Sequence, residues 1–175
     1  ILFFSFFVNP AFCQNVGIGT TTPGFKLDVK NGSINTDSVY RIGGSAVLSI
    51  KGLNNIFAGN NTGTAITFGG NNTAIGEGAL ASNTGGNSNT ASGKGSLTFN
   101  TTGKENVATG YLALTSNTIG SFNTANGSAA MLLNNTGSYN TASGASALFS
   151  NNTGIYNTAT GVEALRENTG GSYNT

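Results

Sequence analysis

Side chains that could perform acid–base or metal chemistry are few and scattered in this chain. It contains six Asp and Glu, seven Lys and Arg, no His, and Cys13 as its only cysteine. Residues 72–175 contain four carboxylates that fall at different positions of a 17-residue spacing: Glu77, Glu105, Glu163 and Glu167. Only Glu77 has a charged residue, Lys94, one such step later. General acid–base catalysis needs a positioned pair, and a metal site needs clustered ligands. We therefore expect solvated surface charge, no enzymatic activity, no cofactor and no metal site.

An aromatic side chain recurs every 17 residues toward the C-terminus, at Phe122, Tyr139, Tyr156 and Tyr173. Two hypotheses follow for this row. Exposed rings could stack on sugars, or they could pack against a neighbouring coil or subunit, which is the interpretation that we favour. A net charge of +1, with 7% charged residues, does not favour a nucleic-acid partner.

Threonine forms a second row at the same spacing, interrupted by one valine: Thr73, Thr90, Val107, Thr124, Thr141 and Thr158. A flat face of regularly spaced Thr could bind ice, but such a face usually needs two parallel rows and only one is clear. Asn-x-Ser/Thr sequences are frequent, and we attribute them to the high Asn and Thr content. A calcium-binding β-roll would need a regular Asp, and residues 55–175 contain none.

These rows belong to six copies of a 17-residue repeat that occupies residues 72–173 without insertion or deletion. We number the repeat from its first Asn, so that Ala stands at position three and Gly at positions five and fifteen. Position one is Asn72, Asn89, Asn106, Asn123, Asn140 and Asn157, and position twelve is Asn83, Asn100, Asn117, Asn134, Asn151 and Asn168. Position nine is Leu80, Leu97, Leu114, Met131, Leu148 and Leu165. Such retention of residue types argues against disorder, which the low charge and the high Asn, Thr, Ser and Gly content would otherwise allow.

A fixed period of this length indicates stacked units that contact only their neighbours. Seventeen residues with two Gly are too few for a pair of helices. We predict an all-β chain: a parallel β-solenoid, or β-roll, whose coils each have one strand near positions one to four and another near positions seven to eleven. Gly would form the two turns. Ala and Leu would point inward, and the Asn side chains would stack as hydrogen-bonded ladders.

The coils do not begin abruptly at residue 72. Residues 55–71 keep Asn55, Gly59 and Gly69 but have Gly63 in place of Leu, and we interpret them as a degenerate first coil. Residues 174–175 are the start of a further, truncated repeat. One Leu and two small residues per coil make a thin core, so we predict that further burial comes from other copies of the chain, with a parallel homotrimer as the leading case.

The preceding segment has a different pattern. Residues 14–54 contain alternating or apolar stretches at 26–30, 39–42 and 46–50, with Asn31-Gly32 and Gly43-Gly44 as turn signals, and they predict a small β-rich module. Residues 1–13 are apolar and end in Ala11-Phe12-Cys13, which is typical of an incomplete secretory signal peptide. The alternative is lipidation at Cys13. Either feature indicates export to the cell surface or beyond, and the first run is too short to span a membrane.

Two segments resemble known families. The run Asn72-Thr73-Ala74-Ile75-Gly76, repeated with its Ala-Leu pair, resembles the head repeats of trimeric autotransporter adhesins, whose period is shorter. Asn15 to Pro23, with Lys26-Leu27-Asp28-Val29, is similar to the opening of secreted bacterial tail-fibre-domain-containing proteins. The resemblance implies a trimeric, surface-exposed structural fibre or adhesin-like stalk for attachment. The alternatives are a glycan-binding repeat module and the non-catalytic stalk of a longer protein with a self-cleaving C-terminal chaperone.

Overall fold

The structure, a computed structural model, describes residues 16–18, 27–29, 39–42, 45–49 and 53–175. The proposed signal peptide lies outside these residues. The chain divides into two compact units, Ile1–Asp37 and Ser38–Thr175. In the first unit β1 (Val16–Ile18) pairs in parallel with β2 (Leu27–Val29). Residues 14–54 were predicted to form one module, whereas β1 and β2 fall in the first unit and the later strands of that segment in the second.

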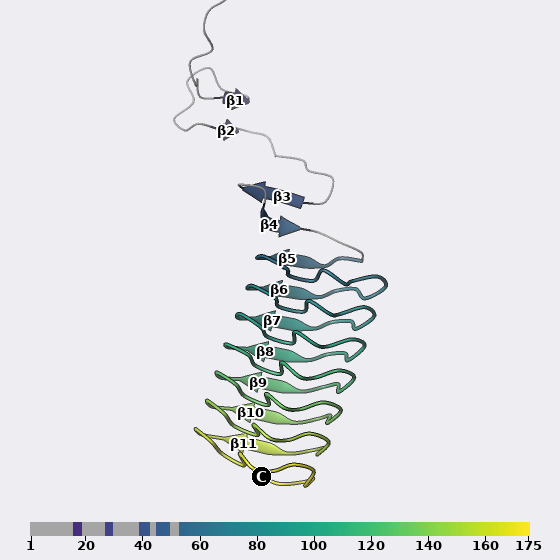
Figure 1. The fold of residues 1–175 in the computed structure, drawn as a ribbon, viewed down its shortest axis with the longest axis vertical. Helices are drawn as coiled ribbons and strands as arrows, with labels where there is room; N and C mark the ends of the chain where they lie inside the picture. The colour runs from purple at the N-terminus through teal and green to yellow at the C-terminus, as the bar shows by residue number, and fades with distance from the viewer. Residues whose placement is uncertain (1–15, 19–26, 30–38, 43–44, 50–52) are drawn as a thin grey trace, which may run out of the picture. The chain divides into compact units, whose positions relative to one another are not determined.

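The second unit contains one nine-stranded sheet, which runs in order from β3 to β11 (Figure 1). It opens with an antiparallel pair, β3 (Val39–Ile42) and β4 (Ser45–Ser49), and β4 pairs antiparallel with β5 (Ile56–Ala58). The remaining strands pair in parallel: β6 (Thr73–Ile75), β7 (Thr90–Ser92), β8 (Val107–Thr109), β9 (Thr124–Asn126), β10 (Thr141–Ser143) and β11 (Thr158–Thr160).

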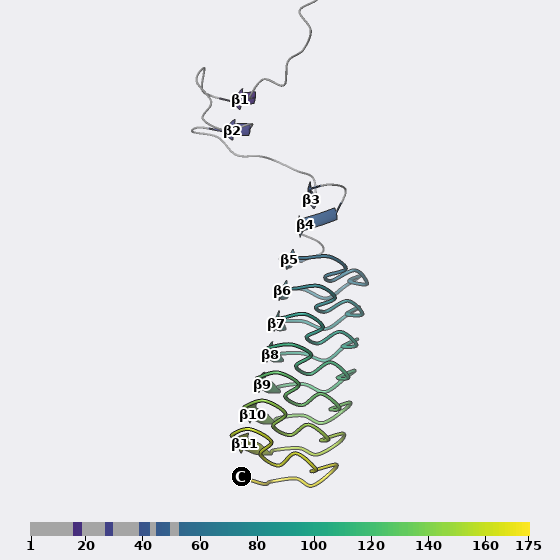
Figure 2. The same ribbon diagram turned by 60° about the vertical axis from the view of Figure 1, so that its left-hand side comes forward.

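Each parallel strand pairs with the residue 17 positions later, as in Ala74 with Ala91 and Ala91 with Ala108. The coils therefore stack without slippage, and every repeat position becomes a row along the solenoid axis. Figures 1 and 2 show the strands of these coils in one column and the connecting turns in others. The predicted all-β parallel solenoid is confirmed.

The second strand predicted for each coil is wrong. Positions seven to eleven form turns in which the backbone N–H of Ala79 donates to Gly76 O, and that of Asn83 to Leu80 O. Leu80 has a φ of +50°, and position nine keeps this left-handed conformation in every copy. A left-handed L-residue costs ~1–2 kcal/mol, so sequence propensity argues against it. Bonds between coils, such as Leu80 N–H to Ser96 O at 3.1 Å, hold the turn in place.

The core inside the coils contains one layer of apolar side chains per coil. Ala at position three and Leu or Met at position nine are inaccessible to solvent from the coil of Ala74 to that of Leu148. A single copy of the chain therefore covers these residues by itself. In the first coil, the aromatic ring of Phe57 occupies the inward space beside Gly63.

Two ladders of buried Asn flank this apolar layer. At position one, Oδ1 of Asn72 accepts from the backbone N–H of Asn89 at 2.9 Å and from its Nδ2 at 3.1 Å. The same Nδ2 also donates to Gly103 O at 2.9 Å. At position twelve, Nδ2 of Asn100 donates to Asn83 Oδ1 at 2.8 Å and to Gly103 O at 3.1 Å. Buried amides are therefore satisfied coil by coil, which avoids the cost of burying polar groups.

The two invariant glycines have different roles. At position five, Gly93 has a φ of +136°, which side-chain-bearing residues rarely adopt. At position fifteen, Gly86 directly follows the bend at 84–85 and has no positive φ, so a left-handed backbone is not what requires glycine there. A Cβ at Gly86 would overlap Gly103 O of the next coil and Oδ1 of Asn83. This glycine is needed because adjacent coils and the Asn ladder approach its Cα closely.

Candidate functional site

The charged side chains of the repeats lie on the surface, and most of them pair locally. Lys94 Nζ is 2.9 Å from Glu77 Oε2 in the preceding coil, and both side chains are more than half exposed. The hydrogen bond and charge of Glu77 raise the pKa of Lys94 above its usual value. The pair therefore contributes fully to the free energy of unfolding at pH values below the pKa of an unfolded Lys. This contribution is lost as the pH rises through the raised pKa of Lys94. Its exposure makes that contribution small.

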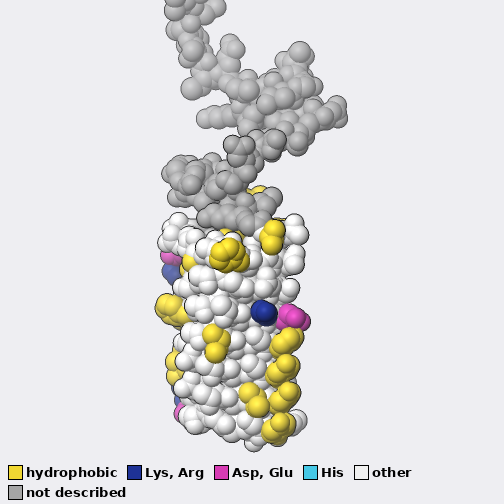
Figure 3. All heavy atoms as spheres, turned by 90° about the vertical axis from the view of Figure 1, so that its right-hand side faces the viewer, with side chains coloured by type: hydrophobic (Ala, Val, Ile, Leu, Met, Phe, Trp, Pro, Cys, Tyr) yellow, Lys and Arg dark blue, Asp and Glu magenta, His cyan; other side chains and the backbone are white. Residues whose placement is uncertain are grey.

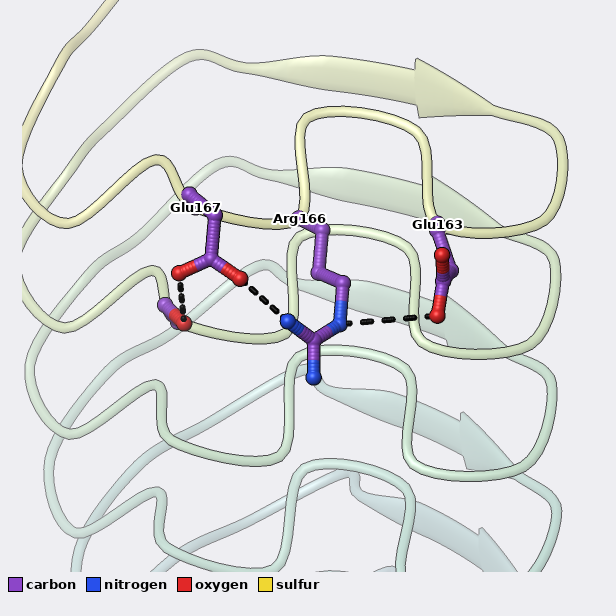
Figure 4. Close-up of polar contacts among 4 residues, drawn as sticks. Glu163, Arg166 and Glu167 are labelled. Atoms are coloured by element: carbon purple, nitrogen blue, oxygen red, sulfur yellow. Dashed lines mark hydrogen bonds and ion pairs between the residues drawn. The ribbon is translucent and has the colours of Figure 1, made fainter.

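Figure 4 shows the densest charged cluster, in the coil of β11. Arg166 Nε lies 3.6 Å from Glu163 Oε1, and the Arg166 guanidinium also pairs with Glu167. The Ser150 hydroxyl donates to Glu167 at 3.5 Å, and Arg166 lies 5.0 Å above the ring centre of Phe149. Both carboxylates are thus engaged by one cation, and the arrangement offers no recurring acid–base pair.

Within the residues that the structure describes, no three His, Cys, Asp or Glu side chains come close enough together to hold a metal ion. Nor do those residues include a helix that is long and apolar enough to cross a membrane.

The aromatic row forms a continuous stack. Successive ring centres of Phe122, Tyr139, Tyr156 and Tyr173 lie 4.9, 4.8 and 5.2 Å apart, with interplanar angles of 4°, 11° and 15°. All four rings are exposed to solvent, and Figure 3 shows a column of hydrophobic side chains on the lower part of one face of the solenoid. Most ring faces in the stack are covered by neighbouring rings, and ring edges remain exposed. The row is therefore poorly suited to stacking sugars and well suited to holding adjacent coils together.

The outer face of the strands carries two rows, because positions two and four both point away from the core. The first is the Thr row, mostly exposed, with Val107 among its members. The second is mixed and has Thr only at 109 and 160: Ile75, Ser92, Thr109, Asn126, Ser143 and Thr160. This face therefore lacks the second regular Thr row that an ice-binding surface needs.

Three of the Asn-x-Ser/Thr sequences begin at ladder residues. Asn100, Asn134 and Asn151 are inaccessible to solvent, and their side-chain amides are hydrogen-bonded within the position-twelve ladder. These three sites are closed to glycan attachment in the folded chain.

A groove of about 860 Å³ runs along the solenoid axis between the rows at positions eleven and thirteen. Its lining spans six coils and combines hydroxyl, amide and apolar side chains: Ser82, Phe99, Thr101, Ser116, Thr118, Leu133, Asn135, Ser150, Asn152 and Thr169. Position twelve turns inward between the two rows. This groove was not predicted from the sequence, although one signal was present: position eleven alternates Ser with a large residue through Ser82, Phe99, Ser116, Leu133 and Ser150.

The site residues expected from sequence therefore separate into two groups. The Asn and Leu rows lie inside the solenoid, where their contacts are with the coils themselves. The aromatic row lies on an edge and makes coil-to-coil contacts, and the groove is a separate surface formed by other positions. Comparisons of the chain with protein-family models, with curated proteins and with solved structures found no match.

Proposed function

We propose that this chain is an exported structural protein whose solenoid serves as a stalk or fibre section at the cell surface. The repeat β-solenoid is compatible with that role. The observation that carries the proposal is that the invariant positions are all used in folding, as ladder amides, core side chains or glycines. A spacer requires a defined number of uniform coils, since each coil adds ~4.8 Å along the axis.

Association of copies is the second part of the proposal. Because one chain already covers its core from Ala74 to Leu148, association would instead cover exposed apolar side chains on the outer surface. Phe68 is 84% exposed and Val162 is 76% exposed, which supports a partner of the same chain. We propose a parallel homotrimer, in which equal coil spacing keeps all subunits in register. Light scattering should give three times the chain mass, and a stable folded monomer would refute this part.

Deletion of whole periods tests the stalk. Removing residues 106–122 deletes one 17-residue period and leaves Asn123 to follow Glu105, so every row continues. We expect this variant to fold and to shorten the solenoid by ~4.8 Å. A matched deletion of residues 106–119 removes fewer residues but places ladder Asn opposite other side chains, and it should be strongly destabilised. Circular dichroism and small-angle scattering provide the two measurements.

The two deletions together test whether the coils are interchangeable units. If both deletions unfold, the coils are not interchangeable units and length is not freely adjustable. If both fold equally well, register along the axis does not control the structure. Only a stable whole-period deletion beside an unstable partial one supports a modular spacer.

A further inference from the structure

The axial groove differs in charge from the neighbouring surfaces of the solenoid. None of its ten lining residues is charged. Elsewhere on the coils, Glu77 pairs with Lys94, and Lys104 and Glu105 are exposed. Glu167 continues the position-eleven row at the C-terminal end of the groove, but it pairs with Arg166. A neutral ligand therefore fits this surface better than a nucleic acid or an acidic polymer.

The polar lining provides both acceptors and donors along the groove. The hydroxyl of Thr101 donates to Thr118 O of the next coil at 3.0 Å, and that of Thr118 lies 2.6 Å from Asn135 Oδ1 and 3.2 Å from Asn135 O. Each hydroxyl oxygen keeps lone pairs that can accept from donors such as sugar hydroxyls. The exposed side chains of Asn135 and Asn152 carry amide N–H groups that donate. Polyhydroxylated ligands need both kinds of partner.

The apolar lining repeats every second coil. Phe99 and Leu133, 54% and 43% exposed, are separated by Ser116 and flanked by Ser82 and Ser150. With ~4.8 Å per coil, the protruding side chains are ~9.6 Å apart. A β-1,4-linked pyranose chain is straight, advances by a similar length per sugar, and presents the same face at every second sugar. The two-coil repeat of the groove and the two-sugar repeat of such a chain are therefore similar in length.

From the charge, the polar lining and this spacing, we propose that the groove binds a neutral, extended β-1,4-linked polysaccharide of the cellulose or chitin class. Phe99 and Leu133 contact the same face of alternate sugars, and the position-thirteen row forms hydrogen bonds with sugar hydroxyls. The inference rests on the proposed role as a cell-surface stalk and adds a ligand to it. The aromatic stack does not serve as this site because its rings cover one another.

Calorimetric titration of the full chain with cellohexaose, chitohexaose and maltohexaose tests the inference. The two β-linked probes distinguish a glucan from an N-acetylated polymer, and the α-linked probe is neutral but curved. We expect binding of at least one β-linked hexasaccharide, weaker binding of the corresponding disaccharide, and none of maltohexaose. Phe99→Ala and Leu133→Ala should each weaken binding roughly tenfold.

Two substitutions that each introduce a tyrosine, one inside the groove and one outside it, provide a matched control. Ser116→Tyr fills the gap between Phe99 and Leu133 and should abolish binding, whereas Ser128→Tyr adds the same side chain at exposed position six, outside the groove. Tyr139→Ala, in the aromatic stack, should leave the affinity unchanged. All variants are compared by thermal unfolding, since these positions are partly or fully exposed.

Several results would overturn the inference. They are no binding of either β-linked hexasaccharide, equal binding of maltohexaose, or loss of binding in Tyr139→Ala but not in Ser116→Tyr. If Ser116→Tyr instead lowers the oligomer mass, the groove is covered by a second copy and not by glycan. The period-deletion experiment would still stand in each of these cases, so failure of the ligand assignment is separable from failure of the stalk.

Discussion

The first coil and the coils that follow it solve the same packing problem with different side chains. Residues 55–71 have Phe57 at position three and Gly63 at position nine, where later coils have Ala and Leu or Met. A Cβ at Gly63 would overlap the Phe57 ring, so the ring occupies the space that Leu fills elsewhere. The volume in the coil is retained although both residues differ.

At other positions the first coil keeps the same residue types as the later coils. The first coil keeps Asn55 at position one, Gly59 with a φ of +129°, and Gly69, whose Cα lies against the next coil. At position twelve it has Ile66, which packs on the core where the ladder begins. The comparison separates positions that fill volume from positions that set backbone geometry. The first can trade residues if the total is kept, and the second cannot.

The largest expected effect is from breaking the shared Asn row with Asn106→Asp. Nδ2 of Asn106 donates to Asn89 Oδ1 at 3.2 Å and to Gly120 O at 2.8 Å. A carboxylate there would face two acceptors in a site without solvent, which should cost ~4 kcal/mol of unfolding free energy at neutral pH. Burial would raise the carboxyl pKa in the folded state, so stability should increase as the pH falls through that pKa.

The free energy of unfolding of this variant is measured in urea at pH 7 and at pH 5, each time relative to the unsubstituted chain at the same pH. Asn126→Asp, at an exposed strand position, is the control and should change little. A loss of equal size at both pH values would show that the buried row does not discriminate the charge.

Gly93→Ala should have the next largest effect. It combines a φ of +136° with overlap between the new methyl group and the Gly110 carbonyl of the adjacent coil, at an expected cost of ~3 kcal/mol. Gly78→Ala is the matched variant, with a φ of +71° and no atom within 4 Å of the new Cβ, and it should cost ~1 kcal/mol. Equal midpoints in denaturant unfolding would contradict the distinction between strain and close approach.

Single substitutions at the two core residues of the first coil should have an intermediate effect on stability, which the double variant should largely reverse. Gly63→Leu should cost ~3 kcal/mol because the side chain meets the Phe57 ring. Phe57→Ala should cost ~3 kcal/mol by leaving a cavity. The double variant recreates the Ala and Leu pair of later coils, and we expect it to recover most of both losses. A double-mutant cycle measures the coupling, and additive losses would show that the two residues do not share one space.

The smallest effect is expected from lengthening the position-twelve ladder with Ile66→Asn. The new amide would accept from Asn83 but lose the apolar contact of Ile66 with the core, so stability should change by less than ~1 kcal/mol. The reverse substitution, Asn83→Ile, removes its bonds with Asn100 and Gly86 and should cost ~2 kcal/mol. Chemical unfolding of the two variants would contradict this if their order were reversed.

Sequence reasoning reached the period, the parallel register and the inward rows, because these depend only on contacts between residue i and residue i+17. Such contacts repeat the same pair of residue types in every coil, as with Ala74 and Ala91, and the repetition can be read directly. The degenerate first coil was also visible, since Asn55, Gly59 and Gly69 keep their places.

Only the tertiary structure decided the path within a coil. Left-handed Leu is unfavourable by itself, and it is held here by hydrogen bonds from the coils on either side. Hints remained in the residues that adopt this conformation readily, such as Gly78 and Gly95 at position seven and Gly63 at position nine. The same path turns position twelve inward and so leaves a groove between positions eleven and thirteen. The rows follow from sequence periodicity, but which rows border one surface depends on backbone geometry that coil stacking imposes.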